Sequence, residues 1–141
     1  MKTSARNTFS GTVTAVTKGA VNAEIQLTSK SGIKIVAIIT NGSVDTLGLK
    51  EGKAALALVK ASWIILGKEL HKVKISTRNV LCGTVDAVHK GAVNSEVSIK
   101  LPGGEVLTSI ITNGSVQSME LRQGEHVCAA FKASSVIIAV E

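Results

Sequence analysis

The sequence predicts an all-β protein made of two tandem five-stranded antiparallel barrels, each with one short helix. Three observations carry this prediction. Residues 4–67 align with residues 76–139 at a constant offset of 72 positions without a gap, and 29 of the 64 aligned pairs are identical. Each half contains short β-branched runs separated by Gly, Ser and Asn breaks. The connections between these runs are too short for the crossovers of a parallel sheet, which favours antiparallel pairing.

The repeat divides the chain into a first domain at residues 1–67, a linker at residues 68–75 and a second domain at residues 76–141. A repeat of this length exceeds the periods of helical solenoids and fits a whole small domain. Domains of about 65 residues bury only about 60% of their unfolded surface. We therefore expect each half to be stabilised by its twin and by other chains.

The first three strands of the first half are expected at residues 9–16, 21–28 and 33–40. The second run alternates, with its apolar side chains on one side and its polar ones on the other, as in a half-buried strand. Residues 29–32 form a turn between the second and third strands. The equivalent place in the second half is Pro102-Gly103-Gly104, which is a stronger turn signal.

After Thr40 the apolar period changes and predicts a short helix. Val44, Leu47 and Leu49 supply the apolar positions, Ser43 is the expected N-cap, and Gly48 ends the helix. Two further strands are expected at residues 54–59 and 63–66. Five short strands in about 65 residues close most economically into a small barrel of the OB type.

Composition restricts the cores and the partners. The chain is 45% hydrophobic with only one Trp and two Phe, so its cores must be built from Val, Ile, Leu and Ala. The net charge of +6 favours anionic partners. The first residues lack an apolar signal-peptide region, and no apolar run approaches the roughly 18 residues of a membrane span. We expect a soluble cytoplasmic protein without a membrane partner.

Cysteine and histidine do not recur between the halves. Cys82 and Cys128 both lie in the second half, and we expect them to be small buried or half-buried thiols. His71, His89 and His126 have no duplicated partners and no ligand spacing, so no zinc site is expected. The paired carboxylates of acid–base catalysis and of Ca²⁺ or Mg²⁺ sites are also missing. No metal cation, no cofactor and no enzymatic activity are therefore expected.

The polar residues kept in both halves lie at strand ends and are mostly hydrogen-bond donors. Glu24, with its equivalent Glu96, is the only carboxylate among them. Arginine, lysine and hydroxyl groups together suit a small multivalent oxyanion, and backbone amides at Ala5, Ala61 and the turn at residues 19–22 can complete its shell. The kept polar residues of the strand ends are Ser4, Arg6, Asn7, Thr40, Lys60 and Ser62, with Ser76, Arg78, Asn79, Thr112, Lys132 and Ser134.

Other interpretations of these residues stay open. A single Arg or Lys at a strand end is usually a solvated surface residue, and Asn7 and Asn22 suit turns that bond their own backbone. An OB-type oligonucleotide-binding module is the alternative function, but such modules stack bases on aromatic side chains. Here Trp63 aligns with Ser135, so no aromatic position recurs. A subunit that senses an anion and passes the signal to a partner is a third interpretation.

The motifs together resemble a known family. Ser-Ala-Arg-Asn at residue 4, Gly-Thr-Val at residue 11, Lys-Gly-Ala-Val-Asn-Ala-Glu at residue 18, Thr40 and Lys-Ala-Ser at residue 60 look like the molybdate-binding Mop, or TOBE, domain. The tandem arrangement resembles the di-domain molbindins. This resemblance implies OB-like barrels, a homotrimer, and non-enzymatic cytoplasmic binding of molybdate or tungstate for storage and homeostasis. The helix-turn-helix of related regulators and the P-loop of related transport ATPases are not seen in the sequence.

The resemblance also implies two kinds of oxyanion site, at interfaces between barrels and near a threefold axis. Thr77 departs from the family's Ala, although a backbone amide contact would survive, and Ser95 replaces the Ala before Glu96. The implied interface residues are Ser4, Ala5, Arg6, Thr40, Lys60, Ala61 and Ser62, and in the second set Ser76, Thr77, Arg78, Thr112, Lys132, Ala133 and Ser134. The implied threefold-axis residues are Gly19, Ala20, Val21, Asn22, Gly91, Ala92, Val93 and Asn94.

Overall fold

The computed structural model describes residues 1–141 and confirms the all-β prediction, with ten strands in two five-stranded antiparallel sheets. The strands of the first repeat are β1 (Asn7–Lys18), β2 (Asn22–Thr28), β3 (Lys34–Thr40), β4 (Ala54–Val59) and β5 (Ile65–Gly67). Those of the second repeat are β6 (Asn79–Lys90), β7 (Asn94–Lys100), β8 (Val106–Thr112), β9 (His126–Phe131) and β10 (Ile137–Ala139). The helices are α1 (Asn41–Leu47) and α2 (Asn113–Met119).

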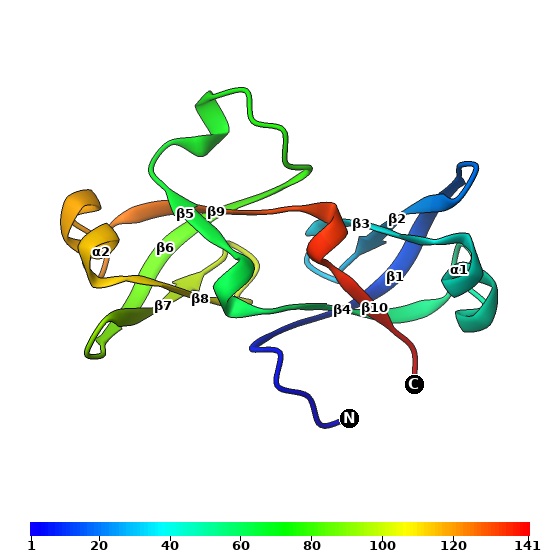
Figure 1. The fold of residues 1–141 in the computed structure, drawn as a ribbon, viewed down its shortest axis with the longest axis horizontal. Coiled ribbons are helices and arrows are strands. Elements are labelled where there is room, and N and C mark those ends of the chain that lie inside the picture. Colours follow the sequence, from blue (N-terminus) through cyan, green and yellow to red (C-terminus); the bar gives the residue numbers. More distant parts are fainter. The chain divides into compact units, whose positions relative to one another are not determined.

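The last strand of each repeat joins the sheet of the other repeat (Figure 1). One sheet has the order β10-β4-β1-β2-β3, and the other has the order β5-β9-β6-β7-β8. Two compact units result, which we call unit 1 (residues 1–59 and 132–141) and unit 2 (residues 60–131). The units thus differ from the halves of the repeat by the exchange of one short strand each.

Each exchanged strand completes a small barrel. In unit 1, β10 pairs with β4 and also contacts β3 at the opposite edge of the sheet. In unit 2, β5 pairs with β9 and contacts β8 in the same way. The two edges of each sheet are thereby brought together, which is the closure expected of an OB-like barrel.

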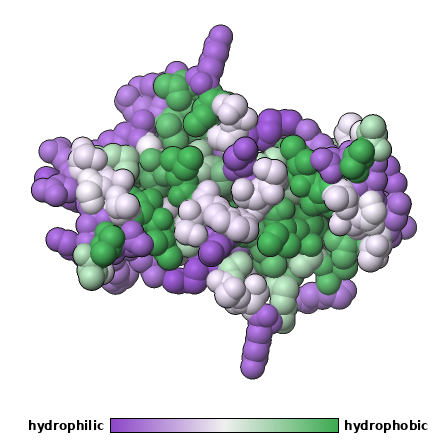
Figure 2. All heavy atoms as spheres, viewed as in Figure 1, coloured by the Kyte–Doolittle hydropathy of each residue, from purple (hydrophilic) through white to green (hydrophobic).

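The barrel interiors hold aliphatic side chains, as the composition predicted. The fully buried side chains of unit 1 include Val13, Ile25 and Val59. Those of unit 2 include Val85, Ile99 and Leu107. Phe131 is 1% exposed and fills the second core. Surface hydrophobic atoms nevertheless remain on the face shown in Figure 2.

Both repeats keep Gly-Thr-Val where the first strand approaches the end of the second closely, just before a β-bulge. The register of β1 with β2 shifts between Val13 and Ala15, which marks a β-bulge, and β6 with β7 shifts at the same position. A Cβ atom on Gly11 would lie 2.5 Å from the carbonyl oxygen of Thr28. Gly83 meets the carbonyl oxygen of Lys100 in the same way. Only glycine permits this approach of two backbones.

The N-cap of the first helix is Thr40, so the prediction of Ser43 was wrong. The Thr40 hydroxyl accepts a hydrogen bond from the amide of Ser43 at 3.0 Å, and Thr112 does the same for Ser115 at 3.1 Å. The helix starts three residues earlier than the apolar period indicated, because the strand passes directly into the helix. No helix of the chain is both long enough and apolar enough to cross a bilayer.

The cysteines differ from expectation. The segment after β5, which spans the predicted linker, contains a 3₁₀ turn, η2, at Leu70–Lys72. Cys82 and Cys128 are joined in a disulfide, so the prediction of two thiols was wrong. They stand directly opposite one another on β6 and β9, a pairing that depends on the strand register and cannot be read from the sequence spacing.

The ends of the two helices offer a matched test of backbone strain. Gly48 closes α1 at φ 62°, and Glu120 closes α2 at φ 53° in the same left-handed region. The left-handed conformation costs a residue with a Cβ atom about 1 kcal/mol of conformational free energy. We expect Glu120→Gly to raise the free energy of unfolding by roughly 0.5–1 kcal/mol, and Gly48→Ala to lower it by about 1 kcal/mol. Urea unfolding followed by circular dichroism measures both, and an unchanged midpoint for Glu120→Gly would contradict the strain.

Candidate functional site

The charged and hydroxyl side chains of the predicted interface sites are exposed, except that of Thr77, and the alanines of the two Lys-Ala-Ser segments are buried. Arg6, Lys60 and Ser62 are exposed, and so are their equivalents in the second repeat. Ala61 is 1% exposed and Ala133 is 4% exposed, so their methyl groups anchor the Lys-Ala-Ser segments to the cores. Each segment therefore holds a cation and a hydroxyl at the surface on a fixed backbone.

The strand exchange decides which donors lie within one unit. Lys60 precedes the 3₁₀ turn η1 (Ala61–Trp63), which contacts β8 and so belongs with Thr112 at the end of that strand. Lys132 precedes η3 (Ala133–Ser135), which contacts β3 and belongs with Thr40. The order of the repeat grouped Thr40 with Lys60, Ala61 and Ser62. Within each unit, the Thr of one repeat lies with the Lys-Ala-Ser of the other.

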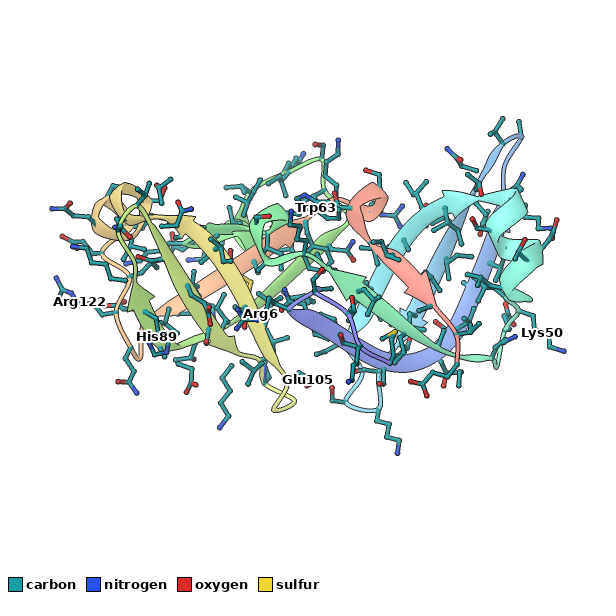
Figure 3. All side chains as sticks on the ribbon, turned by 60° about the horizontal axis from the view of Figure 1, so that its bottom comes forward. Arg6, Lys50, Trp63, His89, Glu105 and Arg122 are labelled. Atoms are coloured by element: carbon teal, nitrogen blue, oxygen red, sulfur yellow. A yellow bond between two sulfur atoms is a disulfide. The ribbon has the colours of Figure 1, made fainter.

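Two hydrogen bonds and one ring contact position η1 in unit 2. The amide of Trp63 donates to the carbonyl of Lys60 at 3.0 Å, and the Ser109 hydroxyl on β8 donates to the carbonyl of Ile64 at 2.9 Å. The ammonium of Lys60 lies 5.8 Å from the centre of the Trp63 ring, within the range of a cation–π contact. These contacts orient Lys60 over a half-exposed indole, and Figure 3 marks the position of Trp63.

The Ser-Ala-Arg-Asn segment is fastened by its asparagine. Asn7 is 1% exposed, and its side-chain amide donates to the carbonyl of Val59 at 3.1 Å, across the β1–β4 pair. Arg6, just before it, remains at the surface (Figure 3). Asn7 is thus a buried strand residue rather than a turn former, and its role is to hold the backbone that carries Arg6.

The second repeat fastens the same place through an additional hydroxyl. Asn79 is also 1% exposed and lies opposite Phe131, and the Thr77 hydroxyl donates to the carbonyl of Phe131. The departure from Ala at this position therefore uses the new hydroxyl internally. It leaves the backbone amide of Thr77 as the group that corresponds to the amide of Ala5.

The hydroxyl groups of Thr40 and Thr112 already have partners in the protein. Besides accepting the capping amide, the Thr40 hydroxyl lies 2.9 Å from the Ser43 Oγ and donates to it. Thr112 makes the same bond to Ser115 at 2.9 Å. A ligand at this position would therefore meet a linked pair of hydroxyls, and sequence reasoning named only the threonine of each pair.

The turns predicted for the second kind of site are exposed and held from behind by an asparagine. The amide of Gly19 donates to the carbonyl of Asn22 at 2.8 Å, which closes the turn. Asn41, the first residue of α1, donates its backbone amide to Val21 at 2.9 Å and its side-chain amide to the carbonyl of Gly19 at 2.9 Å. Gly91, Val93 and Asn113 repeat the arrangement. Sequence reasoning missed Asn41 and Asn113 as the residues that support the turns, although Thr-Asn-Gly-Ser is identical in both halves.

Asn41 and Asn113 differ in one respect. The Oδ1 atom of Asn113 accepts a hydrogen bond from the Ser95 hydroxyl at 2.6 Å. The Oδ1 atom of Asn41 is buried without a hydrogen-bond partner, because Ala23 stands where the second repeat has Ser95. The Ser95 substitution therefore serves the support of the turn.

The chain matches the TOBE domain family model twice, at residues 3–66 and 75–138. The chain belongs to the TOBE family. It is 43% identical over 140 residues to the molybdenum transport protein ModE of Azotobacter vinelandii, and 41% identical over 140 residues to the molybdenum-pterin-binding protein MopA of Rhodobacter capsulatus. The alignments cover 99% of this chain, but the chain spans only about half the length of these curated relatives, 52% and 53%.

A solved structure matches this chain from end to end. The cytoplasmic molybdate-binding protein ModG, in a crystal form with molybdate bound, superposes with a TM-score of 0.97 at 43% sequence identity, covering 100% of both chains. The DNA-binding transcriptional dual regulator ModE of Escherichia coli is 36% identical over 140 residues, which cover 52% of its length. Both repeats of this chain thus share their fold with a solved molybdate-binding protein.

The buried asparagine oxygens predict opposite effects of two reciprocal substitutions. Ala23→Ser places a hydroxyl beside the unpartnered Asn41 Oδ1 and should raise the free energy of unfolding by about 1 kcal/mol. Ser95→Ala removes the partner of Asn113 and should lower it by about 1–3 kcal/mol. Both sites are 2% exposed, so solvent cannot compensate. Denaturant unfolding measures both variants, and a destabilised Ala23→Ser would contradict the assignment.

Proposed function

We propose that the chain binds molybdate or tungstate without catalysing a reaction, and stores or buffers the oxyanion in the cytoplasm. The observation that carries the proposal is the duplicated set of exposed donors on a fold that superposes along its whole length with a molybdate-bound protein. Net charge +6 and the single kept carboxylate pair add to the preference for anions.

The proposed interface sites use the exposed guanidinium of Arg6, the ammonium of Lys60 and the hydroxyl of Ser62, with their equivalents from the other repeat. A guanidinium offers a planar fork of donors to two oxygens of a tetrahedral oxyanion, whereas an ammonium offers a point charge. Buried Ala61 and Ala133 keep the backbone amides of these segments in place. The exposed turns at residues 19–22 and 91–94 supply the proposed second kind of site.

The proposed oligomer is a homotrimer, with oxyanion sites where barrels of different chains meet. Large apolar side chains are exposed at equivalent positions of both repeats, as expected of a surface that another chain covers. Val21 and Val93 at the turn tips are 70% and 71% exposed, and Ile65 and Ile137 on the exchanged strands are 63% and 52% exposed. A surface with this symmetry suits an assembly in which both repeats make the same contact.

Nucleic-acid binding is not favoured by the aromatic residues. Phe9 is 4% exposed and Phe131 is 1% exposed, so neither can stack on a base. Only Trp63 reaches the surface, at 46% exposed, and it lies beside Lys60. An OB-type groove that binds single strands needs several such platforms along the strand.

Isothermal titration with molybdate, tungstate, sulfate and phosphate tests the ligand. We expect saturable heat with molybdate and tungstate at micromolar protein, and much weaker binding of sulfate and phosphate. Absence of saturation with molybdate would overturn the proposal. A salt-sensitive gel shift with single-stranded DNA, together with silent titrations, would establish the oligonucleotide alternative instead.

Paired arginine substitutions test the interface sites. Arg6→Ala with Arg78→Ala should abolish most of the interface binding, because a hydrogen bond to a charged group contributes about 1.5–3 kcal/mol, or roughly a 10- to 150-fold change in affinity. The matched control is Lys50→Ala with Arg122→Ala, since these exposed cations are also equivalent in the repeat but lie outside the donor set (Figure 3).

The control should bind molybdate with unchanged stoichiometry, and both variants should keep the oligomeric mass in light scattering. Equal stoichiometry in the arginine variant and the wild type would contradict the residue assignment. Loss of the oligomer in the arginine variant would show that Arg6 and Arg78 hold the assembly instead of the ligand.

A further inference from the structure

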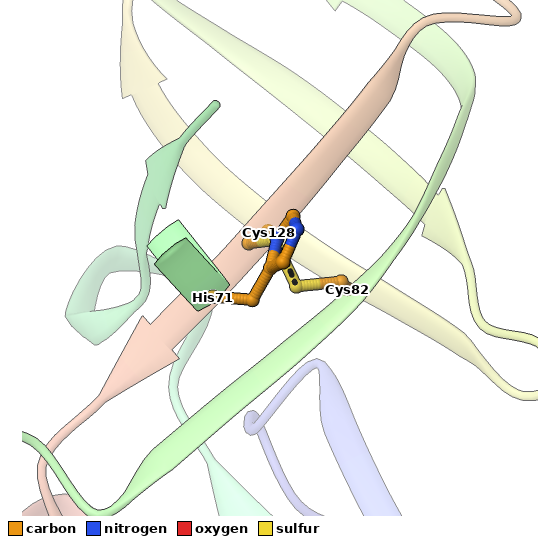
Figure 4. The surroundings of a disulfide bond; sticks show 3 residues. All are labelled: His71, Cys82 and Cys128. Atoms are coloured by element: carbon orange, nitrogen blue, oxygen red, sulfur yellow. Dashed lines mark hydrogen bonds between the residues drawn. A yellow bond between two sulfur atoms is a disulfide. The ribbon is translucent and has the colours of Figure 1, made fainter. Parts of the chain in front are cut away.

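Three potential metal-ligand side chains meet on the outer face of unit 2. Cys82 and Cys128 are disulfide-bonded across β6 and β9, and His71 reaches them from η2 in the segment after β5 (Figure 4). The His71 Nδ1 atom lies 3.5 Å from the sulfur of Cys128 and 3.9 Å from that of Cys82. All ligand atoms of the three residues lie within 4.8 Å of one another. We call this group the His71 cluster.

The spacing of the His71 cluster fits a tetrahedral zinc ion once the disulfide is opened. Zinc–sulfur and zinc–nitrogen bonds of about 2.3 and 2.05 Å place sulfur and nitrogen ligands about 3.5 Å apart, and two sulfur ligands about 3.8 Å apart. The imidazole Nδ1 already stands at this distance from the Cys128 sulfur and 0.4 Å farther from the Cys82 sulfur, at 3.5 and 3.9 Å. Only the two sulfurs must separate, and breaking the bond between them permits this by side-chain rotation.

A pocket and a second histidine lie next to the His71 cluster. The pocket has a volume of about 290 Å³ and is lined in part by Cys82 and His126. His126 is exposed and precedes Cys128 by two residues on β9, so both side chains point to the same face of the strand. Its ring centre is 6.0 Å from that of His71. His126 is thus in a position to supply the fourth ligand.

The first repeat shows that the barrel does not require these side chains. In unit 1 the equivalent cross-strand pair is Ser10 opposite Leu56, and Ala54 stands where unit 2 has His126. A similar pocket of about 240 Å³ lies beside this pair. Because the same strands pair with the same register without thiols or imidazoles, packing alone does not account for the set in unit 2.

We propose that the reduced form of unit 2 binds Zn²⁺ through His71, Cys82, Cys128 and His126, and that the disulfide closes this site. A dithiol reductant transfers two electrons and two protons to the disulfide, which gives two protein thiols and the cyclic disulfide of the reductant. Zn²⁺ then replaces the two thiol protons, which leave to solvent, and takes neutral imidazole nitrogens as its other ligands. The site is independent of oxyanion binding and responds to the redox poise of the surroundings.

Cobalt and zinc titrations of the full chain test the proposal. The protein is reduced with dithiothreitol, freed of reductant by gel filtration under nitrogen, and titrated with Co²⁺, whose visible and near-ultraviolet bands report tetrahedral thiolate ligation. We expect one equivalent to bind to the reduced chain, displacement by one equivalent of Zn²⁺, and no such spectrum from the oxidised chain. Alkylation of the reduced thiols with iodoacetamide should abolish the signal without any substitution.

The first repeat supplies the matched variant. Cys82→Ser with Cys128→Leu reproduces the Ser10–Leu56 pair and should lose the thiolate spectrum, with a fall in zinc affinity of at least about 100-fold. His71→Ala, at an exposed position, should weaken binding roughly 10- to 100-fold. His89→Ala is the control. It removes an exposed imidazole on β6 that is not part of the proposed site, and the variant should bind zinc as the wild type does.

Three results would overturn the proposal. These are equal zinc binding by the oxidised and reduced chains, unchanged binding in the Cys82→Ser, Cys128→Leu variant, and the absence of a tetrahedral thiolate spectrum from the reduced wild type at micromolar cobalt. Circular dichroism of each variant establishes that the barrels are folded. If a variant does not fold, the alkylated wild type tests the same point, because it lacks free thiols without any substitution.

Discussion

The exchange of the last strand between the two repeats is the constraint on which the rest of the structure depends. Neither repeat closes its own barrel, because β10 pairs with β4 and β5 pairs with β9. The chain crosses between units directly after β4 and β9, and the Lys-Ala-Ser segments stand at these two crossings. The buried alanines anchor each crossing, so the same few residues hold the barrel closed and present a cation and a hydroxyl at the surface.

The polar residues kept in both repeats fall into two groups, those that support the backbone and those that present donors at the surface. Asn7 fastens the end of β4, Thr40 caps α1 and Asn41 supports the turn at residues 19–22. These side chains are kept because a buried or terminal backbone group would otherwise lack its hydrogen bond. Arg6 and Lys60 lie at the surface. The kept residues therefore divide into a supporting set, which the structure shows, and a donor set, which titration tests.

The two repeats differ at single side chains while the backbone conformation and strand register at those positions stay the same. Gly48 and Glu120 occupy the same left-handed position, and Ala23 and Ser95 face the same asparagine oxygen. Ser10 opposite Leu56 becomes Cys82 opposite Cys128. In each case one repeat serves as the control for the other. The last difference adds a group of ligands to unit 2 without a change in strand register.

The sequence alone determined the fold class, the five strands and one α-helix of each repeat in outline, and the donor motifs, because alternation, β-branched runs, glycine turns and the 72-residue repeat are local signals. Strands β2, β3 and β4 lie close to the predicted ranges. Only the tertiary structure decided which barrel each three-residue strand completes, since the two repeats present nearly the same local pattern and the choice depends on packing. It likewise decided that Cys82, Cys128 and His71 meet, because their approach depends on strand pairing and on the path of the segment after β5.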